Sequence, residues 1–216
     1  MADEDGILTS WQANAESWLS AVREQRIASR RVTDAAILDA IRAGRPRRVL
    51  DVGCGEGWLC RALHEEGIEA VGVDATDTLI DAARAAGAGR FEVLRYDELA
   101  RDPLQLGQFD AVVFNSALFE ADPGLILRTL VPAVHPSGRL LIQTVHPDRI
   151  AGEAGWREER FADFGALFPA VMPWYFHPLA GWDRLLEASG WTVLERREPR
   201  ACSGGLPCSL ILIARS

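Results

Sequence analysis

The residues best suited to chemistry lie in a glycine-rich turn, Asp51-Val-Gly-Cys-Gly-Glu-Gly57. Its three glycines let the backbone bend tightly and approach a ligand at positions where a Cβ atom would intrude. Nicotinamide and flavin proteins use similar turns, so the glycines alone do not identify the ligand. Asp51 and Glu56 add negative charge to the turn. This charge suits a zwitterionic amino-acid tail and a sulfonium better than a pyrophosphate, which prefers bare amides and positive potential.

Further polar residues follow the next three apolar runs of the chain. Asp74, with Ala75 beside it, can bind the two hydroxyls of a ribose, as an acidic residue also does in dinucleotide enzymes. The Asp97 carboxylate can accept a hydrogen bond from an adenine amine while Tyr96 covers the ring. Because open α/β sheets bind ligands at the carboxyl ends of their strands, we expect one crevice. The expected cofactor-binding residues are Asp51, Gly53, Cys54, Gly55, Gly57, Asp74, Ala75, Tyr96, Asp97, Asn115 and Ser116.

Short apolar runs alternate with amphipathic segments from residue 45 onward. This alternation predicts an α/β fold with a doubly wound, mostly parallel sheet. The expected strands are 48–52, 70–74, 91–95, 109–114 and 139–145, and the expected helices are 58–66, 78–86 and 125–134. After a break, helix 179–189 precedes strands 191–197 and 209–215. The connection between these two strands is too short for a helical crossover, so we expect them to be antiparallel neighbours.

The segment before residue 45 is expected to be helical. One stripe carries Trp11, Asn14, Ala15, Trp18 and Val22, and a second helix over 35–43 would start at an N-cap at residues 33–34. We therefore expect a single domain in four parts: an N-terminal helical cap (1–44), a cofactor-binding core (45–145), an aromatic-rich lid insertion (146–178), and a C-terminal helix with an antiparallel strand pair (179–216).

The run Val49-Leu-Asp-Val-Gly-Cys-Gly-Glu-Gly-Trp58 resembles motif I of the class I, Rossmann-like, S-adenosylmethionine-dependent methyltransferases. Residues 71–74, 109–113 and 136–140 are similar to the motifs that follow it in that family. The resemblance implies a seven-stranded sheet with an antiparallel last strand, S-adenosylmethionine as cofactor, and a small-molecule acceptor. It also implies that Gly53 and Gly55 lie along the methionine portion, Asp74 at the ribose, Asp97 at the adenine and Asn115 near the sulfonium.

Composition excludes several other chemistries. The chain has no lysine, which removes Walker A nucleotide binding, pyridoxal Schiff bases and the Tyr-x-x-x-Lys pair of short-chain dehydrogenases. Its four cysteines form two C-x5-C pairs, a spacing that suits neither zinc nor redox sites, so no metal is expected. The net charge of −8 argues against nucleic acid as partner, and eight arginines between 23 and 48 favour a solvated helix face. An acidic N-terminus and the lack of a long apolar run predict no membrane association and a cytoplasmic location.

Aromatic residues cluster between 156 and 182, and Trp11 and Trp18 are expected to join them. The cluster is either a roof that binds an apolar or planar acceptor or a small satellite core. His146 and His177 are the candidate catalytic bases, and each has a packing role as its alternative. The sequence leaves open whether the nucleophilic atom of the acceptor is oxygen, nitrogen or carbon. Two other functions also remain open: an NAD(P)-dependent oxidoreductase and a non-catalytic protein that binds the adenosyl cofactor. The oligomeric state is left open.

Overall fold

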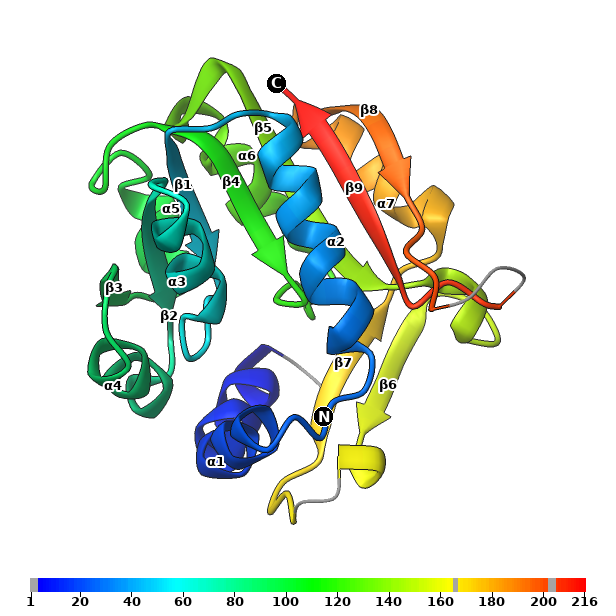
Figure 1. Ribbon diagram of the computed structural model, residues 1–216. Helices are drawn as coiled ribbons and strands as arrows, with labels where there is room; N and C mark the ends of the chain where they lie inside the picture. The colour runs from blue at the N-terminus through cyan, green and yellow to red at the C-terminus, as the bar shows by residue number, and fades with distance from the viewer. Residues whose placement is uncertain (1–3, 165–166, 202–204) are drawn as a thin grey trace.

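A seven-stranded sheet with the order β3-β2-β1-β4-β5-β9-β8 crosses the centre of the protein (Figure 1). The structure is a computed structural model that describes residues 4–164, 167–201 and 205–216. Neighbours among β1 to β5 are parallel, whereas β9 is antiparallel to both β5 and β8. The sheet confirms the fold predicted from the sequence. Its strands are β1 (Arg48–Val52), β2 (Glu69–Asp74), β3 (Arg90–Val93), β4 (Phe109–Asn115), β5 (Val134–Val145), β8 (Thr192–Arg197) and β9 (Ser209–Arg215).

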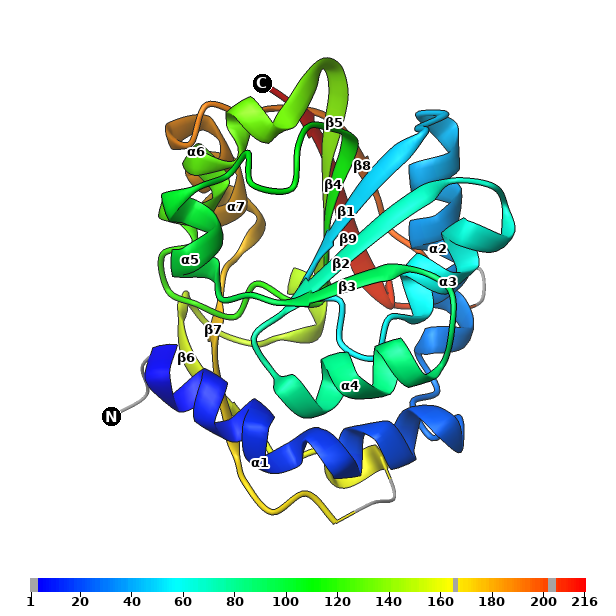
Figure 2. The ribbon, with the colours of Figure 1, turned by 90° about the vertical axis from the view of Figure 1, so that its left-hand side faces the viewer.

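Helices cover both faces of this sheet (Figure 2). One face carries α2 (Arg30–Ala43), α3 (Trp58–Glu65) and α4 (Asp77–Ala85), and the other carries α5 (Tyr96–Arg101), α6 (Gly124–Thr129) and α7 (Leu179–Ala188). Side chains of a strand alternate between the faces, so Val49 packs in the core with α2 and α3 while Leu50 packs in the core on the opposite face. Because both faces are covered, most residues of the central strands β1 and β4 are apolar and buried.

Several predicted element boundaries are wrong, including the start of the strand expected over 139–145, which begins at Val134. The helix expected over 125–134 stops at Thr129, and a 3₁₀ turn (Val131–Ala133) leads into β5, since Pro132 lacks the amide that would continue the helix. The helix expected to start after residues 33–34 starts at Arg30 instead. Asp34 does not cap it, because its carboxylate accepts a hydrogen bond from Arg30 Nε at 2.9 Å. The third strand ends at Val93, short of Arg95.

A cap lies against the carboxyl edge of the sheet, where the strands of the core end (Figure 2). It combines α1 (Glu4–Arg23) with an antiparallel hairpin of β6 (Gly155–Glu159) and β7 (Met172–Phe176). The sequence pattern did not predict this hairpin. Of the segment expected to form the helical cap, α1 lies at this edge, whereas α2 packs on the sheet against β5 and β9. No described helix combines the length and apolarity needed to cross a membrane.

Candidate functional site

The loop between β1 and α3 bends through three glycines with positive φ, Gly53 (77°), Gly55 (55°) and Gly57 (76°). A Cβ atom at Gly53 would lie 2.5 Å from the Ala117 Cβ, and one at Gly57 would lie 2.5 Å from the Phe91 ring. At these two positions the protein itself therefore requires glycine. Gly55 differs, because the nearest atom to its Cβ position is Trp18 Nε1 at 4.0 Å. Gly55 is thus the position where this loop presents open space to a ligand.

The end of β2 holds the glycine loop in place. Asp74 accepts hydrogen bonds from the amide of Gly55 at 3.0 Å and from the amide of Thr76 at 2.9 Å. Val73 O accepts from the amides of Gly53 and Cys54. Asp74 therefore orders the loop in addition to its expected role at a ribose. Each carboxylate oxygen has a second lone pair, so the side chain can still accept from ribose hydroxyls.

Asp51 is a buried carboxyl group with an unused oxygen. Its Oδ2 accepts a weak bond from the Cys60 thiol at 3.8 Å, whereas Oδ1 has no partner within the described chain. Burial, followed by the neighbouring carboxylates of Asp74 and Glu56, raises the pKa of Asp51 to about 8. A buried acceptor without a partner costs about 1–3 kcal/mol. A cationic ligand group would remove this cost, so the environment of Asp51 fits the ammonium of an amino-acid tail.

The cysteines of this region are not reactive groups. Burial raises the pKa of the Cys54 and Cys60 thiols well above the usual range, which keeps them protonated. The Cys54 thiol lies behind the loop against Gly72, so only its backbone faces the side where a ligand is expected. Cys202 lies outside the described residues.

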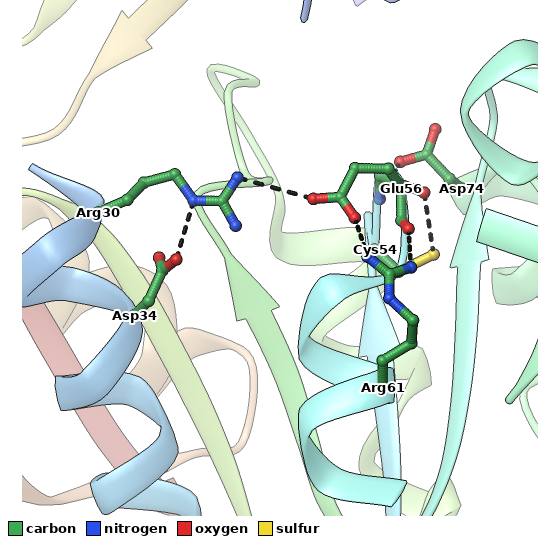
Figure 3. Close-up of polar contacts among 7 residues, drawn as sticks. Arg30, Asp34, Cys54, Glu56, Arg61 and Asp74 are labelled. Atoms are coloured by element: carbon green, nitrogen blue, oxygen red, sulfur yellow. Dashed lines mark hydrogen bonds and ion pairs between the residues drawn. The ribbon is translucent and has the colours of Figure 1, made fainter. Parts of the chain in front are cut away.

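Glu56 is buried within the loop and is neutralised by arginines (Figure 3). Its Oε2 pairs with Arg61 Nη2 at 2.7 Å, and its Oε1 lies 3.6 Å from Arg30 Nη1. Arg30 also bonds Asp34 and lies over the Trp58 ring at 5.0 Å. The sequence pattern assigned Arg30 to a solvated helix face and therefore missed this network. Asp51 and Asp74 are the acidic groups at the loop that pair with no arginine within the described residues.

The residues expected near the adenine and those that follow β4 have different surroundings. Tyr96 is partly buried, donates to Ala117 O at 3.0 Å and lies next to the Gly53 position. Asp97 is exposed and pairs with two surface arginines, Arg95 and Arg101. Asn115 ends β4, and Ser116, with φ of 56°, donates its amide to Gln143 O at 2.8 Å. The structure thus brings Asp51, Gly53, Gly55, Asp74 and Tyr96 together, whereas the Asp97 carboxylate is held by surface arginines.

An aromatic cluster joins α1 to the insertion. Trp11 contacts Trp18 edge-on at 5.2 Å and lies 6.1 Å from Phe161, and Phe161 stacks on Phe168 at 4.3 Å. Trp11 also lies 6.0 Å from Phe119, which follows β4. The expected aromatic group therefore forms a packed cluster, and this cluster lies at the carboxyl edge of the sheet.

The two candidate histidines have different surroundings. His146 is buried with both ring nitrogens engaged: Nδ1 accepts from the amide of Asp148, and Nε2 lies 3.3 Å from Glu198 Oε1. His177 packs between Tyr175 and Trp182, and its Nε2 donates to the Glu120 carbonyl at 3.1 Å. That bond assigns the proton to Nε2 and leaves Nδ1 as a lone pair. Burial lowers the pKa of His177, so the neutral imidazole predominates near pH 7.

A family of proteins described as "Methyltransferase domain" matches residues 22–196 of this sequence. The chain belongs to this methyltransferase family. A solved structure of an S-adenosylmethionine-dependent methyltransferase from Mesorhizobium loti superposes with a TM-score of 0.62 at 25% identity, covering 82% of this chain and 96% of that one. A glycopeptide N-methyltransferase reaches a TM-score of 0.64 at 17% identity, covering 84% and 89% of the two chains, which shows the shared fold.

Curated relatives match a shorter part of this methyltransferase. The ubiquinone biosynthesis O-methyltransferase of Marinobacter nauticus is 30% identical over 106 residues, which cover 46% of this chain and 44% of the relative. The enzyme of the same name from Mesorhizobium japonicum is 34% identical over 111 residues, covering 49% and 45%. The match thus spans less than half the length of either relative.

Family membership confirms the prediction made from the glycine-rich motif, namely a class I methyltransferase with S-adenosylmethionine as cofactor. The comparisons give no support to an oxidoreductase or to a non-catalytic binding protein. The orphaned Asp51 oxygen and the open space at Gly55 are features that such a cofactor would use.

Proposed function

We propose that this protein transfers a methyl group from S-adenosylmethionine to an O, N or C nucleophile of a small apolar or aromatic molecule. The observation that carries the proposal is the buried Asp51 carboxyl group with one oxygen unpartnered beneath a glycine loop that opens at Gly55. Bound at this loop, the cofactor supplies a methyl group already activated by its sulfonium. We assign Asp51 to the cofactor ammonium and Asp74 to the ribose hydroxyls.

The remaining cofactor contacts are also part of the proposal. Ala75 and Tyr96 flank the adenosyl portion, and Asn115 and Ser116 lie at the end of β4 toward the methyl group. Asp97 would accept from the adenine amine, which requires its carboxylate to give up Arg95 or Arg101. Such surface ion pairs contribute at most about 1 kcal/mol, so the exchange is energetically accessible.

The protein contributes mainly position and the exclusion of water. Methyl transfer is an in-line displacement, and holding the reacting atoms about 3–3.5 Å apart can supply about 7–11 kcal/mol of the barrier. The aromatic cluster of α1 and the insertion offers an apolar surface for a flat acceptor at the carboxyl edge. The names of the curated relatives favour a hydroxyl oxygen as the nucleophile.

A hydroxyl acceptor must lose a proton as its oxygen bonds to the methyl group. We assign this proton to Nδ1 of His177, since the Nε2 proton is donated to Glu120 O and Nδ1 has no hydrogen bond within the described chain. We give His146 a structural role, because both of its ring nitrogens already have partners.

The net charge and the cysteines of the chain bear on its partners and its location. A net charge of −8 repels a polyphosphate backbone, which supports a small molecule rather than RNA or DNA as acceptor. Cys54, Cys60 and Cys208 are free thiols, which supports a reducing compartment, and we propose the cytoplasm.

Two experiments test this function. Isothermal titration calorimetry should show binding of S-adenosylhomocysteine and none of NADH. A panel of small phenols, catechols and aromatic amines should then yield a methylated product by mass spectrometry when S-adenosylmethionine is present. Binding of NADH, or failure to bind S-adenosylhomocysteine, would refute the proposal.

A further inference from the structure

Trp18 lies over the glycine loop although it belongs to the cap. Its indole nitrogen is 4.0 Å from the position of a Cβ atom at Gly55, the loop residue that opens to a ligand. Trp18 is partly buried, and its N–H forms no hydrogen bond within the described part of the chain. This N–H is not among the fully buried polar atoms, so it can donate to a ligand that enters at the loop. The position of this N–H points to an acceptor on a bound ligand.

The indole is held in this place by the rest of the cap. Its ring packs edge-on against Trp11 at 5.2 Å and lies 6.2 Å from Phe164. The preceding residue, Ser17, donates its hydroxyl to Leu167 O at 2.6 Å. This bond ties the part of α1 that carries Trp18 to the segment before β7. The donor is therefore oriented before a ligand arrives.

The loop itself has few donors left for an anionic group. Four of its backbone amides already donate hydrogen bonds within the protein. The amides of Gly53 and Cys54 donate to Val73 O, that of Gly55 donates to Asp74, and that of Gly57 donates to Cys54 O. The guanidinium of Arg30 is shared between Asp34 and Glu56. The carboxylates of Asp51 and Asp74 attract the ammonium of an amino-acid tail, but its carboxylate needs a donor on the other side of Gly55.

We propose that Trp18 is a cofactor-binding residue whose indole N–H donates a hydrogen bond to the carboxylate of the cofactor's amino-acid tail. The contact would come from the N-terminal helix rather than from the sheet. The proposal rests on S-adenosylmethionine as the cofactor. It adds to the site a residue that recognises the carboxylate of the cofactor's amino-acid tail.

The test compares two ligands and two variants by isothermal titration calorimetry. The ligands are S-adenosylhomocysteine and its decarboxylated analogue, S-adenosyl-3-thiopropylamine, which keeps the amine and lacks the carboxylate. Trp18→Phe removes the N–H and retains an aromatic ring. Trp191→Phe is the matched control, because it removes an indole N–H that donates to Leu127 O of α6 instead.

We expect Trp18→Phe to bind S-adenosylhomocysteine about tenfold more weakly than the wild type, as for loss of a hydrogen bond to a charged group. The same variant should bind the decarboxylated analogue with unchanged affinity, and Trp191→Phe should leave both affinities unchanged. Equal weakening of both ligands by Trp18→Phe would show a packing role and overturn the proposal, as would no weakening of either. If the wild-type protein bound neither ligand, the cofactor assignment would fail and the role of Trp18 with it.

Discussion

Asn14 and Ala170 form a two-way pair: Asn14 Nδ2 donates to Ala170 O at 2.8 Å, and Ala170 N donates to Asn14 Oδ1 at 3.0 Å. The side-chain amide of Asn14 thus pairs with both backbone groups of Ala170, as a neighbouring strand would. The pair fastens α1 to the segment that leads into β7. Asn14 is fully buried and also donates to Ser10 Oγ at 3.1 Å. The pair joins the two pieces of the cap, which lie far apart in the sequence.

Asn14→Ala should lower the free energy of unfolding by about 1–3 kcal/mol, because it leaves the Ala170 amide and the Ser10 hydroxyl without their partner. Urea denaturation measures this change. Gln12→Ala, at an exposed position of the same helix, serves as the control. Equal stability of the two variants would mean that the pair does not hold the cap.

Asp51 should make cofactor binding depend on pH. In the free protein, burial and the carboxylates of Asp74 and Glu56 raise the pKa of Asp51 to about 8. A ligand ammonium favours the ionised form, so below pH 8 each binding event must displace a proton. Affinity for S-adenosylhomocysteine should therefore fall as the pH drops from 8 to 6, by at most about tenfold per unit. Calorimetry at several pH values measures this slope, and Asp51→Asn should flatten it. An identical slope in the variant would place the titrating group elsewhere.

Asp74→Ala should weaken S-adenosylhomocysteine binding by about 1.5–3 kcal/mol, the value of a hydrogen bond to a charged group. The variant should also be less stable, because the amides of Gly55 and Thr76 lose their acceptor. Calorimetry and urea denaturation on the same protein separate the two effects. Asp81→Ala, at an exposed position of α4, is the control for loss of a carboxylate. Unchanged affinity in Asp74→Ala would contradict the ribose assignment.

His177→Ala should reduce kcat for a hydroxyl acceptor by about a hundredfold, as for loss of a general base. Burial lowers the pKa of His177 from 6.5, so the wild-type rate should be level near pH 7 and decline below that value as the imidazole gains a proton. Steady-state rates across the pH range give both readings. His135→Ala, which removes an exposed imidazole, is expected to behave as wild type. If His177→Ala kept the wild-type pH profile, proton transfer would not involve this residue.

The fold was largely predictable because its signals are local. The central strands and the crossover helices each carry a continuous apolar run or an amphipathic period, and burial on both faces makes these patterns strong. The β6–β7 hairpin has no such pattern: β6 contains charged residues such as Arg157 and Glu158, and β7 contains Pro173. It depends on contacts with α1 and on pairing across a loop, neither of which the sequence displays.

The positions of candidate site residues were predictable where they follow from the end of a strand. Asp74 and the glycines of the loop are examples, because the strand and the turn fix their positions. The pairing of Arg30 with Glu56 was not predictable, since the two residues lie far apart in the sequence and are brought together by the fold. Arg30 and Arg61 neutralise Glu56, and Arg95 and Arg101 hold Asp97 at the surface. The i,i+4 spacing of Asp97 and Arg101 is a local signal for an ion pair, whereas no such spacing marks Arg30 as a partner of Glu56.

The hydrogen bonds that the amides of the glycine loop already form affect how fast a ligand can bind. Since the loop is already satisfied by β2 and by its own backbone, it has no need to refold when a ligand enters. Association of the cofactor would then not wait for the loop to reorder.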